Sequence, residues 1–216
     1  MRRPSWLGAP AAALAPRAAY DAWAAAYPPA PHNALMAAEQ AAVLALLPDV
    51  RGRAVLDAGC GTGRYLAALA ARGATRLTGV DFSPAMLARV AVPGSTRVLG
   101  DLTALPFDDG SMDVVVSGLA LNDVAALDLA LAELARVLAP GGTLVYSVIH
   151  PRGGVLGWRR TFPGPGGEAA IAGHWHPPGD HDRACAAAGL VVDRSVEPRV
   201  DGVGAVAIVR RAARAR

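Results

Sequence analysis

The chain has 216 residues, 53% hydrophobic and 18% charged, so it can bury one sizeable core and lacks the composition of a disordered protein. Its net charge is only +3, lysine is absent, and no arginine stripe with interleaved aromatic residues indicates nucleic-acid binding. The two cysteines, Cys60 and Cys185, are too few for a disulfide scaffold, and no apolar run of about 18 residues could cross a membrane.

The first residues share one feature with export signals. Arg2 and Arg3 precede an alanine-rich run, but Pro10, Pro16 and Arg17 interrupt it before an apolar segment forms. We therefore expect a cytoplasmic protein.

Two helices are expected before the first strand. Helical patterns span residues 17–27 and 33–47, and three prolines separate them. Both fall within residues 1–48, which we interpret as an N-terminal helical lid.

From residue 54 onward, short β-rich runs alternate with helical patterns, which is typical of a parallel α/β sheet. Ser83 and Pro84 form a favoured helix start, and leucines from Leu127 to Leu138 follow helical spacing. The expected strands are residues 54–58, 77–81, 97–100, 112–117 and 143–149.

The pattern changes after residue 150. Residues 151–179 are rich in glycine and proline and are expected to form a cover. Within it, residues 158–162 and 168–174 predict a hairpin laid over the sheet edge. A helix at 180–188 and two strands, 190–196 and 203–209, are expected to complete the sheet.

The most informative stretch is Val55-Leu56-Asp57-Ala58-Gly59-Cys60-Gly61-Thr62-Gly63. A buried strand ends in an acid, and alternate glycines then open a helix, so a ligand can lie against bare main chain. A dinucleotide fold would use G-x-G-x-x-G, but Arg64 occupies the third glycine position counted from Gly59. A nicotinamide-dependent oxidoreductase is thus the weaker alternative.

Acids end three successive strands. Asp57, Asp81 and Asp101 each close a predicted strand. The carboxyl ends of parallel strands meet at one crevice, where open α/β sheets bind ligands. Three carboxylates would repel a pyrophosphate, yet they suit a ligand with a ribose, an adenine and a cationic amino-acid head.

With these motifs the sequence resembles the class I, seven-stranded S-adenosylmethionine-dependent methyltransferases of small-molecule type. The resemblance is strong over about residues 50–150 and looser elsewhere. It implies S-adenosyl-L-methionine as cofactor and a doubly wound, mostly parallel, Rossmann-like α/β sheet of seven strands, with an antiparallel last strand, the lid and a short β cover. The blocks that carry it are VLDAGCGTGRY from Val55, GVDFSPAML from Gly79, GDLTALPF from Gly100, DVVVSGLAL from Asp113 and LARVLAPGGTLVY from Leu134.

The resemblance also implies the domain organisation. Residues 1–216 are expected to form a single methyltransferase domain. Its parts are the lid at 1–48, the cofactor-binding half at 50–150, the cover at 151–179, and the last helix and strands at 180–210.

For the methionine end of the donor, the resemblance implies contacts from Asp57 and from the backbone of Gly59, Gly61 and Gly63. Ser117 would line the methyl-transfer end. These positions match the family motif residue by residue.

For the nucleoside end, the resemblance implies that Asp81 holds the ribose. Phe82 and Met86 would lie beside the adenine. Asp101 and the amide of Leu102 would bind the adenine edge, although an acid after a strand is also a common turn former.

The helix around Tyr20 resembles the one that closes over the methionine end in many relatives. This makes Tyr20 and Tyr27 cofactor contacts of second rank. Because Tyr20, Trp23 and Tyr27 sit at helical spacing, core packing is an equal alternative.

The acceptor residues are expected near the fourth and fifth strand ends. Relatives that methylate amino nitrogens have an Asn or Asp and two prolines where this chain reads Ser117-Gly118-Leu119-Ala120, which disfavours DNA bases and glutamine. His150 closes the fifth strand and is the candidate base, although it could equally orient the acceptor or cap the strand. Asn122 is the second catalytic candidate.

The cover supplies further candidates. His174 and His176 would line the acceptor pocket, and we expect no metal because methyl transfer from a sulfonium needs no Lewis acid. Of Arg159 and Arg160, at most one can face the pocket, since neighbouring strand residues point to opposite faces. An inward guanidinium would match an anionic acceptor, and a solvated cover strand is the alternative.

The sequence therefore predicts a methyltransferase acting on a small molecule or carrier-bound acyl group, with O-methylation favoured and a carboxylate as candidate acceptor. The chain also loosely resembles the malonyl-acyl-carrier-protein methyltransferases. A non-catalytic S-adenosylmethionine-binding relative stays open, as does a homodimer. No nucleic-acid or membrane partner is expected.

Overall fold

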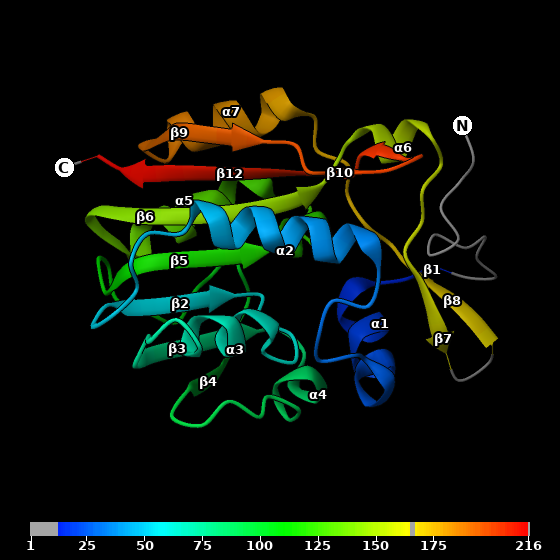
Figure 1. Cartoon of the computed structure of the whole chain (residues 1–216), viewed down its shortest axis with the longest axis horizontal. Coiled ribbons are helices and arrows are strands. Elements are labelled where there is room, and N and C mark those ends of the chain that lie inside the picture. Colours follow the sequence, from blue (N-terminus) through cyan, green and yellow to red (C-terminus); the bar gives the residue numbers. More distant parts are fainter. Residues whose placement is uncertain (1–12, 165–166, 216) are drawn as a thin grey trace.

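A seven-stranded sheet forms the centre of the computed structural model, which describes residues 13–164 and 167–215. Only β12 runs antiparallel to its neighbours, so the expected mostly parallel sheet with an antiparallel last strand is confirmed (Figure 1). In spatial order the strands are β4 (Thr96–Leu99), β3 (Arg76–Asp81), β2 (Ala54–Ala58), β5 (Met112–Gly118), β6 (Leu138–Ile149), β12 (Ala207–Arg214) and β9 (Leu190–Val196).

Helices cover both faces of this sheet (Figure 1). On one face, α2 (Ala34–Leu46) and α3 (Arg64–Ala70) pack against alternate strand residues such as Val55. On the other, α5 (Leu127–Val137) and α7 (Pro178–Ala187) pack against the intervening residues such as Leu56. Because successive side chains of a strand point to opposite faces, a continuous apolar strand such as β2 must be buried on both.

Local signals set several boundaries. The strands β2 and β9 have the predicted limits. The Ser83 hydroxyl accepts a hydrogen bond from the Met86 amide at 3.1 Å and caps α4 (Pro84–Leu87), as expected of that residue type. In contrast, β6 begins at Leu138, directly after α5, although we expected the strand to begin at residue 143.

The predicted hairpin exists but lies elsewhere. β7 (Thr161–Gly164) pairs with β8 (Gly167–Ile171), and β1 (Ala13–Leu14) adds a third strand. This small sheet packs on α1 (Pro16–Trp23), beyond the carboxyl ends of the main strands (Figure 1), and not over the sheet edge. Its apolar residues find their partners on α1, which sequence spacing does not reveal.

Two further predictions need correction. The expected helix 17–27 is α1 followed by a short 3-10 helix, Ala24–Ala26. The expected strand 203–209 is divided into β11 (Gly204–Ala205), which pairs with β10 (Arg199–Val200), and β12. A four-residue helix, α6 (Arg152–Val155), lies within the cover.

Some sequence features fall outside the described residues. These are Arg2, Arg3 and Pro10 of the signal-like start, and residues 165–166 of the predicted hairpin turn. Among the residues that are described, no helix is long and apolar enough to cross a membrane.

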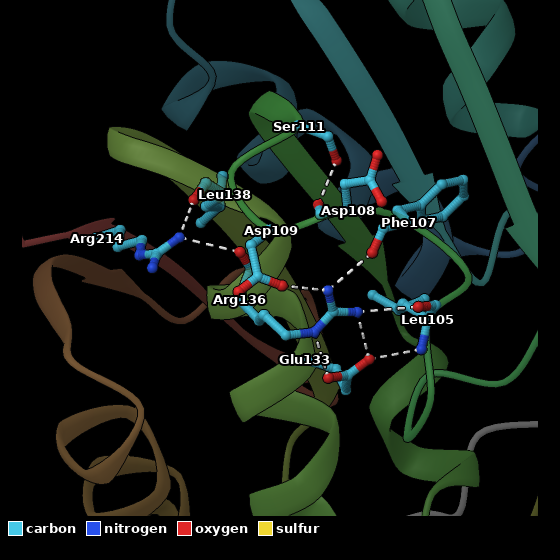
Figure 2. A network of polar contacts seen from close by, with 9 residues as sticks. All are labelled: Leu105, Phe107, Asp108, Asp109, Ser111, Glu133, Arg136, Leu138 and Arg214. Carbon is cyan, nitrogen blue, oxygen red and sulfur yellow. Dashed lines mark hydrogen bonds and ion pairs between the residues drawn. The ribbon is translucent and has the colours of Figure 1, made fainter.

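An arginine fixes the segment between β4 and β5 (Figure 2). Arg136, in the last turn of α5, donates to the carbonyl oxygens of Leu105 at 2.9 Å and Phe107 at 2.7 Å. It also forms ion pairs with Glu133 at 2.6 Å and Asp109 at 2.7 Å. Its side chain remains 30% exposed, so this network anchors a surface segment.

Candidate active site

A cavity of about 370 Å³ lies at the carboxyl ends of the central strands, under the lid. Of the residues predicted to form the site, those that line it are Tyr20, Tyr27, Gly59, Gly61, Asp81, Phe82, Met86, Asp101, Leu102 and Arg160. Those that do not line it are Asp57, Gly63, Ser117, Asn122, His150, Arg159, His174 and His176.

The glycine turn presents bare main chain to this cavity. Gly59 has φ +78°, and a Cβ there would lie 2.4 Å from the Cβ of Ala120, so no larger residue fits. Gly61 has φ +54° and no protein atom in front of its Cβ position within 4 Å, which leaves open space for a ligand. Gly63, at φ +89°, begins α3 behind the turn.

Asp81 keeps hydrogen-bonding capacity after its protein contacts. Its Oδ2 accepts from the Gly61 amide at 2.8 Å, and its Oδ1 accepts from the Ser83 amide at 2.9 Å. A carboxylate has about four acceptor positions, so two remain for the adjacent hydroxyls of a ribose. Burial raises the pKa of Asp81 to about 6.

Asp101 likewise uses only one of its two carboxylate oxygens in the contacts described. Its Oδ1 accepts from both the amide and the hydroxyl of Thr103, at 2.8 and 2.7 Å. Within the described part of the chain no donor occupies Oδ2. That oxygen can accept from an exocyclic amino group, as the adenine hypothesis requires.

Asp57 lies behind the glycine turn, almost fully buried. Its Oδ2 accepts from the Leu66 amide at 3.2 Å, whereas Oδ1 has no partner among the described residues. Burial raises the pKa of Asp57 to about 7. Two more buried oxygens near the turn, Thr62 Oγ1 and Ser117 Oγ, also lack a described partner.

A polar cluster that sequence reasoning missed joins α1 to the segments that carry Asp123 and Arg160 at the cavity. The Tyr20 hydroxyl donates to Asp123 Oδ2 at 3.0 Å, and Arg160 donates to the same oxygen at 3.1 Å and to the Tyr20 hydroxyl at 3.0 Å. A second guanidinium nitrogen of Arg160 bonds the other oxygen of Asp123. The three residues are far apart in sequence, so only the adjacency of Asp123 to the candidate Asn122 could have drawn attention to it.

A second missed cluster ties α2 to the first turn of α3, next to the glycine turn. Glu39, fully buried, accepts from Arg64 at 3.1 Å, from the Tyr65 hydroxyl at 2.7 Å and from the Ser147 hydroxyl. Arg64 and Tyr65 both line the cavity. A lone acid on the buried face of an alanine-rich helix was the signal in the sequence.

Neither catalytic candidate lines the cavity. Asn122 holds the backbone together: its Oδ1 accepts from the Ile149 amide at 2.7 Å, and its Nδ2 donates to the carbonyl of His174 at 3.2 Å. His150 Nε2 lies 3.7 Å from Glu197 Oε2, and its Nδ1 accepts from the Arg152 amide at 3.2 Å. Burial lowers the pKa of His150. Ile149 lines the cavity in its place.

The histidines of the cover lie outside the cavity lining. The rings of His174 and His176 stack at 5.9 Å, and His176 Nε2 lies 2.8 Å from the Val124 carbonyl oxygen. No group of three or more His, Cys, Asp or Glu side chains within residues 13–164 and 167–215 could hold a metal ion. Arg160 lines the cavity and Arg159 is exposed, but both residues precede β7, so the strand predicted at residues 158–162 does not explain their orientation.

The fold and the sequence indicate the same class of protein. The sheet order, the glycine turn and the acids at the ends of β2, β3 and β4 accompany a match of residues 56–146 to the family described as "Methyltransferase domain". Residues 56–146 match this family model, and the chain has the fold of a solved S-adenosylmethionine-dependent methyltransferase.

Particular relatives fall in two groups. A malonyl-[acyl-carrier protein] O-methyltransferase of Dechloromonas aromatica (strain RCB) is 45% identical over 107 residues, which are 49% of this chain and 40% of the relative. A demethylmenaquinone methyltransferase of Clavibacter sepedonicus is 45% identical over 101 residues, 44% of this chain and 41% of the relative. This chain therefore spans about two fifths of the length of these relatives.

Similarity to a solved structure extends further. The S-adenosylmethionine-dependent methyltransferase of Mesorhizobium loti superposes with a TM-score of 0.69 at 25% identity. The match covers 82% of this chain and 98% of that protein.

Proposed function

We propose that this protein transfers the methyl group of S-adenosylmethionine to a small-molecule or carrier-bound acceptor, with oxygen as the accepting atom. The observation that carries the proposal is the convergence of a bare glycine turn with two partly unsatisfied carboxylates on one cavity. We also propose a cytoplasmic setting, which is supported by two free, buried cysteines.

The residues present fit this donor. Asp81 would accept from both ribose hydroxyls, and Asp101 from the adenine amino group. The turn at Gly59 and Gly61 would lie against the methionine part, with Asp57 behind it. The cationic head of the donor would stabilise the ionised form of Asp57, whose pKa burial raises to about 7.

The protein's contribution to the transfer itself is alignment and exclusion of water. A bound donor would supply an activated methyl group: its sulfur–methyl bond would break with the electron pair returning to sulfur, and an oxygen–methyl bond would form. The proton of an accepting hydroxyl would pass to bulk solvent when the product leaves. A carboxylate acceptor would have no proton to lose. His150 contacts Glu197 outside the cavity, so this proposal gives it no role as a base.

Calorimetric titration with S-adenosylmethionine and S-adenosylhomocysteine tests the proposal, with NADH as the competing ligand. We expect the first two to bind and NADH not to. Asp81→Ala should weaken binding by about 1–3 kcal/mol, the value of hydrogen bonds to a charged group. Asp49→Ala, at an exposed site paired with Arg51, is the matched control and should bind normally.

The outcomes separate the alternatives. Binding of NADH without the sulfonium donor would identify an oxidoreductase. Donor binding without any methyl transfer to an acceptor panel would identify a non-catalytic relative. Equal donor affinity in folded Asp81→Ala protein would remove the ribose assignment.

A further inference from the structure

We infer that the acceptor end of this cavity takes an uncharged, flat ring bearing a hydroxyl group, and not a free carboxylate or phosphate. This inference rests on the proposed methyl transfer and names its substrate class. We call the cavity wall formed by Tyr20, Trp23, Tyr27, His32, Leu35 and Met36 the lid wall.

The first observation is that Arg160 is already neutralised. Both of its terminal nitrogens bond Asp123, and one also donates to Tyr20. The two side chains are only 18% and 7% exposed. An anionic acceptor would have to displace Asp123 and leave that buried carboxylate without its cation, with only the Tyr20 hydroxyl still donating to it, which is unfavourable.

The packing around Arg160 also leaves little room for an anion. A Cβ built on Gly173 would lie 2.8 Å from an Arg160 terminal nitrogen, so the backbone of the cover already packs against the guanidinium. Asp123 already occupies the edge formed by the two terminal nitrogens.

Arg64 is the other cation of the lining, and it is equally occupied. It bonds Glu39 through both terminal nitrogens at 3.1 Å and Gln40 at 3.0 Å. Glu39 is fully buried and Arg64 only 10% exposed. The same argument therefore excludes Arg64 as an anion receptor.

The charge of the whole lining disfavours an anion as well. Three aspartates, Asp81, Asp101 and Asp123, face the two arginines, so negative charge exceeds positive by one. The donor has one net positive charge and would balance it. A negatively charged acceptor would disturb that balance in a site that water leaves on closure.

The side chains of the lid wall favour a ring as the acceptor. The rings of Trp23 and Tyr27 meet edge to face at 4.6 Å, and His32 lies within 5.8 Å of both. Leu35 and Met36 add buried aliphatic surface. Aromatic walls of this kind pack best against another ring.

The test uses three probes on protein loaded with S-adenosylhomocysteine: 2-naphthol, 2-naphthoate and 1-octanol. Loading itself, measured first, tests the proposed function separately. We expect 2-naphthol to bind about tenfold or more tightly than 2-naphthoate, since the latter meets no free cation. We also expect it to bind more tightly than 1-octanol, which has a hydroxyl but no ring.

A variant should reduce or remove this preference. Asp123→Asn leaves the Arg160 charge unpaired, and 2-naphthoate affinity should rise about tenfold or more, the value of a charge-assisted hydrogen bond. Glu133→Gln, in the Arg136 network away from the cavity, is the matched control and should change neither affinity.

Three results with the unmodified protein would overturn the inference. These are tighter binding of 2-naphthoate by the unmodified protein, octanol binding as tight as naphthol, or no binding of naphthol to loaded protein. If Asp123→Asn does not fold, Arg160→Met replaces it. A loss of naphthoate affinity in Arg160→Met would show that Arg160 binds the anion directly and would equally refute the idea.

Discussion

Two sides of the cavity differ in how their charged side chains are paired: the donor half, near the glycine turn and Asp81, and the lid half, near the lid wall and Arg160. On the donor side, Asp81 lines the cavity and Asp57 lies behind the glycine turn. Both are buried with no salt-bridge partner among the described residues, and burial raises their pKa values to about 6 and about 7. In the lid half, Arg160 pairs with Asp123 and Arg64 pairs with Glu39.

This difference indicates where each substrate belongs. Buried carboxylates without salt-bridge partners destabilise the free protein, and their charge becomes favourable when a cationic ligand binds. Paired charges give no such gain to an ionic ligand. The donor half is thus suited to a cationic donor, and the lid half to an uncharged acceptor.

The largest effect should come from breaking the pair in the lid half. Glu39→Ala leaves Arg64 buried and unpaired, and we expect a loss of about 3–5 kcal/mol in the free energy of unfolding. Glu133→Ala, in the more exposed network of Figure 2, should cost less than about 1 kcal/mol. Urea denaturation measures both, and equal losses would contradict the contrast between buried and exposed pairs.

Asp57→Asn should instead increase the free energy of unfolding. The carboxyl ionises near pH 4 in the unfolded chain and near pH 7 in the native one, so its destabilising effect accumulates as pH rises through that window. At about 1.4 kcal/mol per pKa unit, the variant should be more stable than the parent by up to about 4 kcal/mol at pH 8.

Denaturation of the ligand-free protein across this range checks the prediction. The gain should shrink toward zero below about pH 3, where both states hold the proton. A difference that does not vary with pH would show that Asp57 is not desolvated. The same variant should bind the donor more weakly.

The next largest loss of stability is expected for a substitution in the glycine turn. Gly59→Ala combines a positive φ with a methyl group 2.4 Å from Ala120, and should destabilise the protein by about 2 kcal/mol or more. Gly52→Ala is the matched control, with φ +69° but open space, and should cost only about 1–2 kcal/mol. Thermal melts of the two variants measure the steric part; if the control lost as much, close packing at Gly59 would be irrelevant.

Asp101→Ala should have the smallest effect, because this acid is exposed. Loss of one hydrogen bond to the adenine amino group should weaken S-adenosylhomocysteine binding by about 0.5–1.5 kcal/mol. With S-inosylhomocysteine, where a carbonyl replaces that amino group, parent and variant should bind equally. A persistent difference would place Asp101 away from the adenine.

The donor half was predictable because its geometry is local. Asp57, Gly59 and Gly61 belong to one strand–turn–helix unit, and the acids of the next two strands reach the same edge by the parallel order of the sheet. The family resemblance of residues 50–150 adds the donor, and the match at 56–146 falls within that span.

The acceptor half was less predictable. His150 and Asn122 were chosen by their position along the chain, yet Ile149 faces the cavity and its neighbour His150 does not. In a strand, one residue of error turns a side chain to the other face. The inward orientation of Arg160 was foreseen as one of two choices, but its partner Asp123 was not.

By itself, the sequence determined the parallel sheet, the glycine turn and the acids that end three strands, because each depends on residues close together in the chain. Only the tertiary structure decided which charges are neutralised. Arg160, Asp123 and Tyr20 come from three separate segments, as do Glu39 and Arg64 from two. Ion pairing depends on distances of a few ångströms between such segments, and these are set by how the lid and cover pack on the sheet.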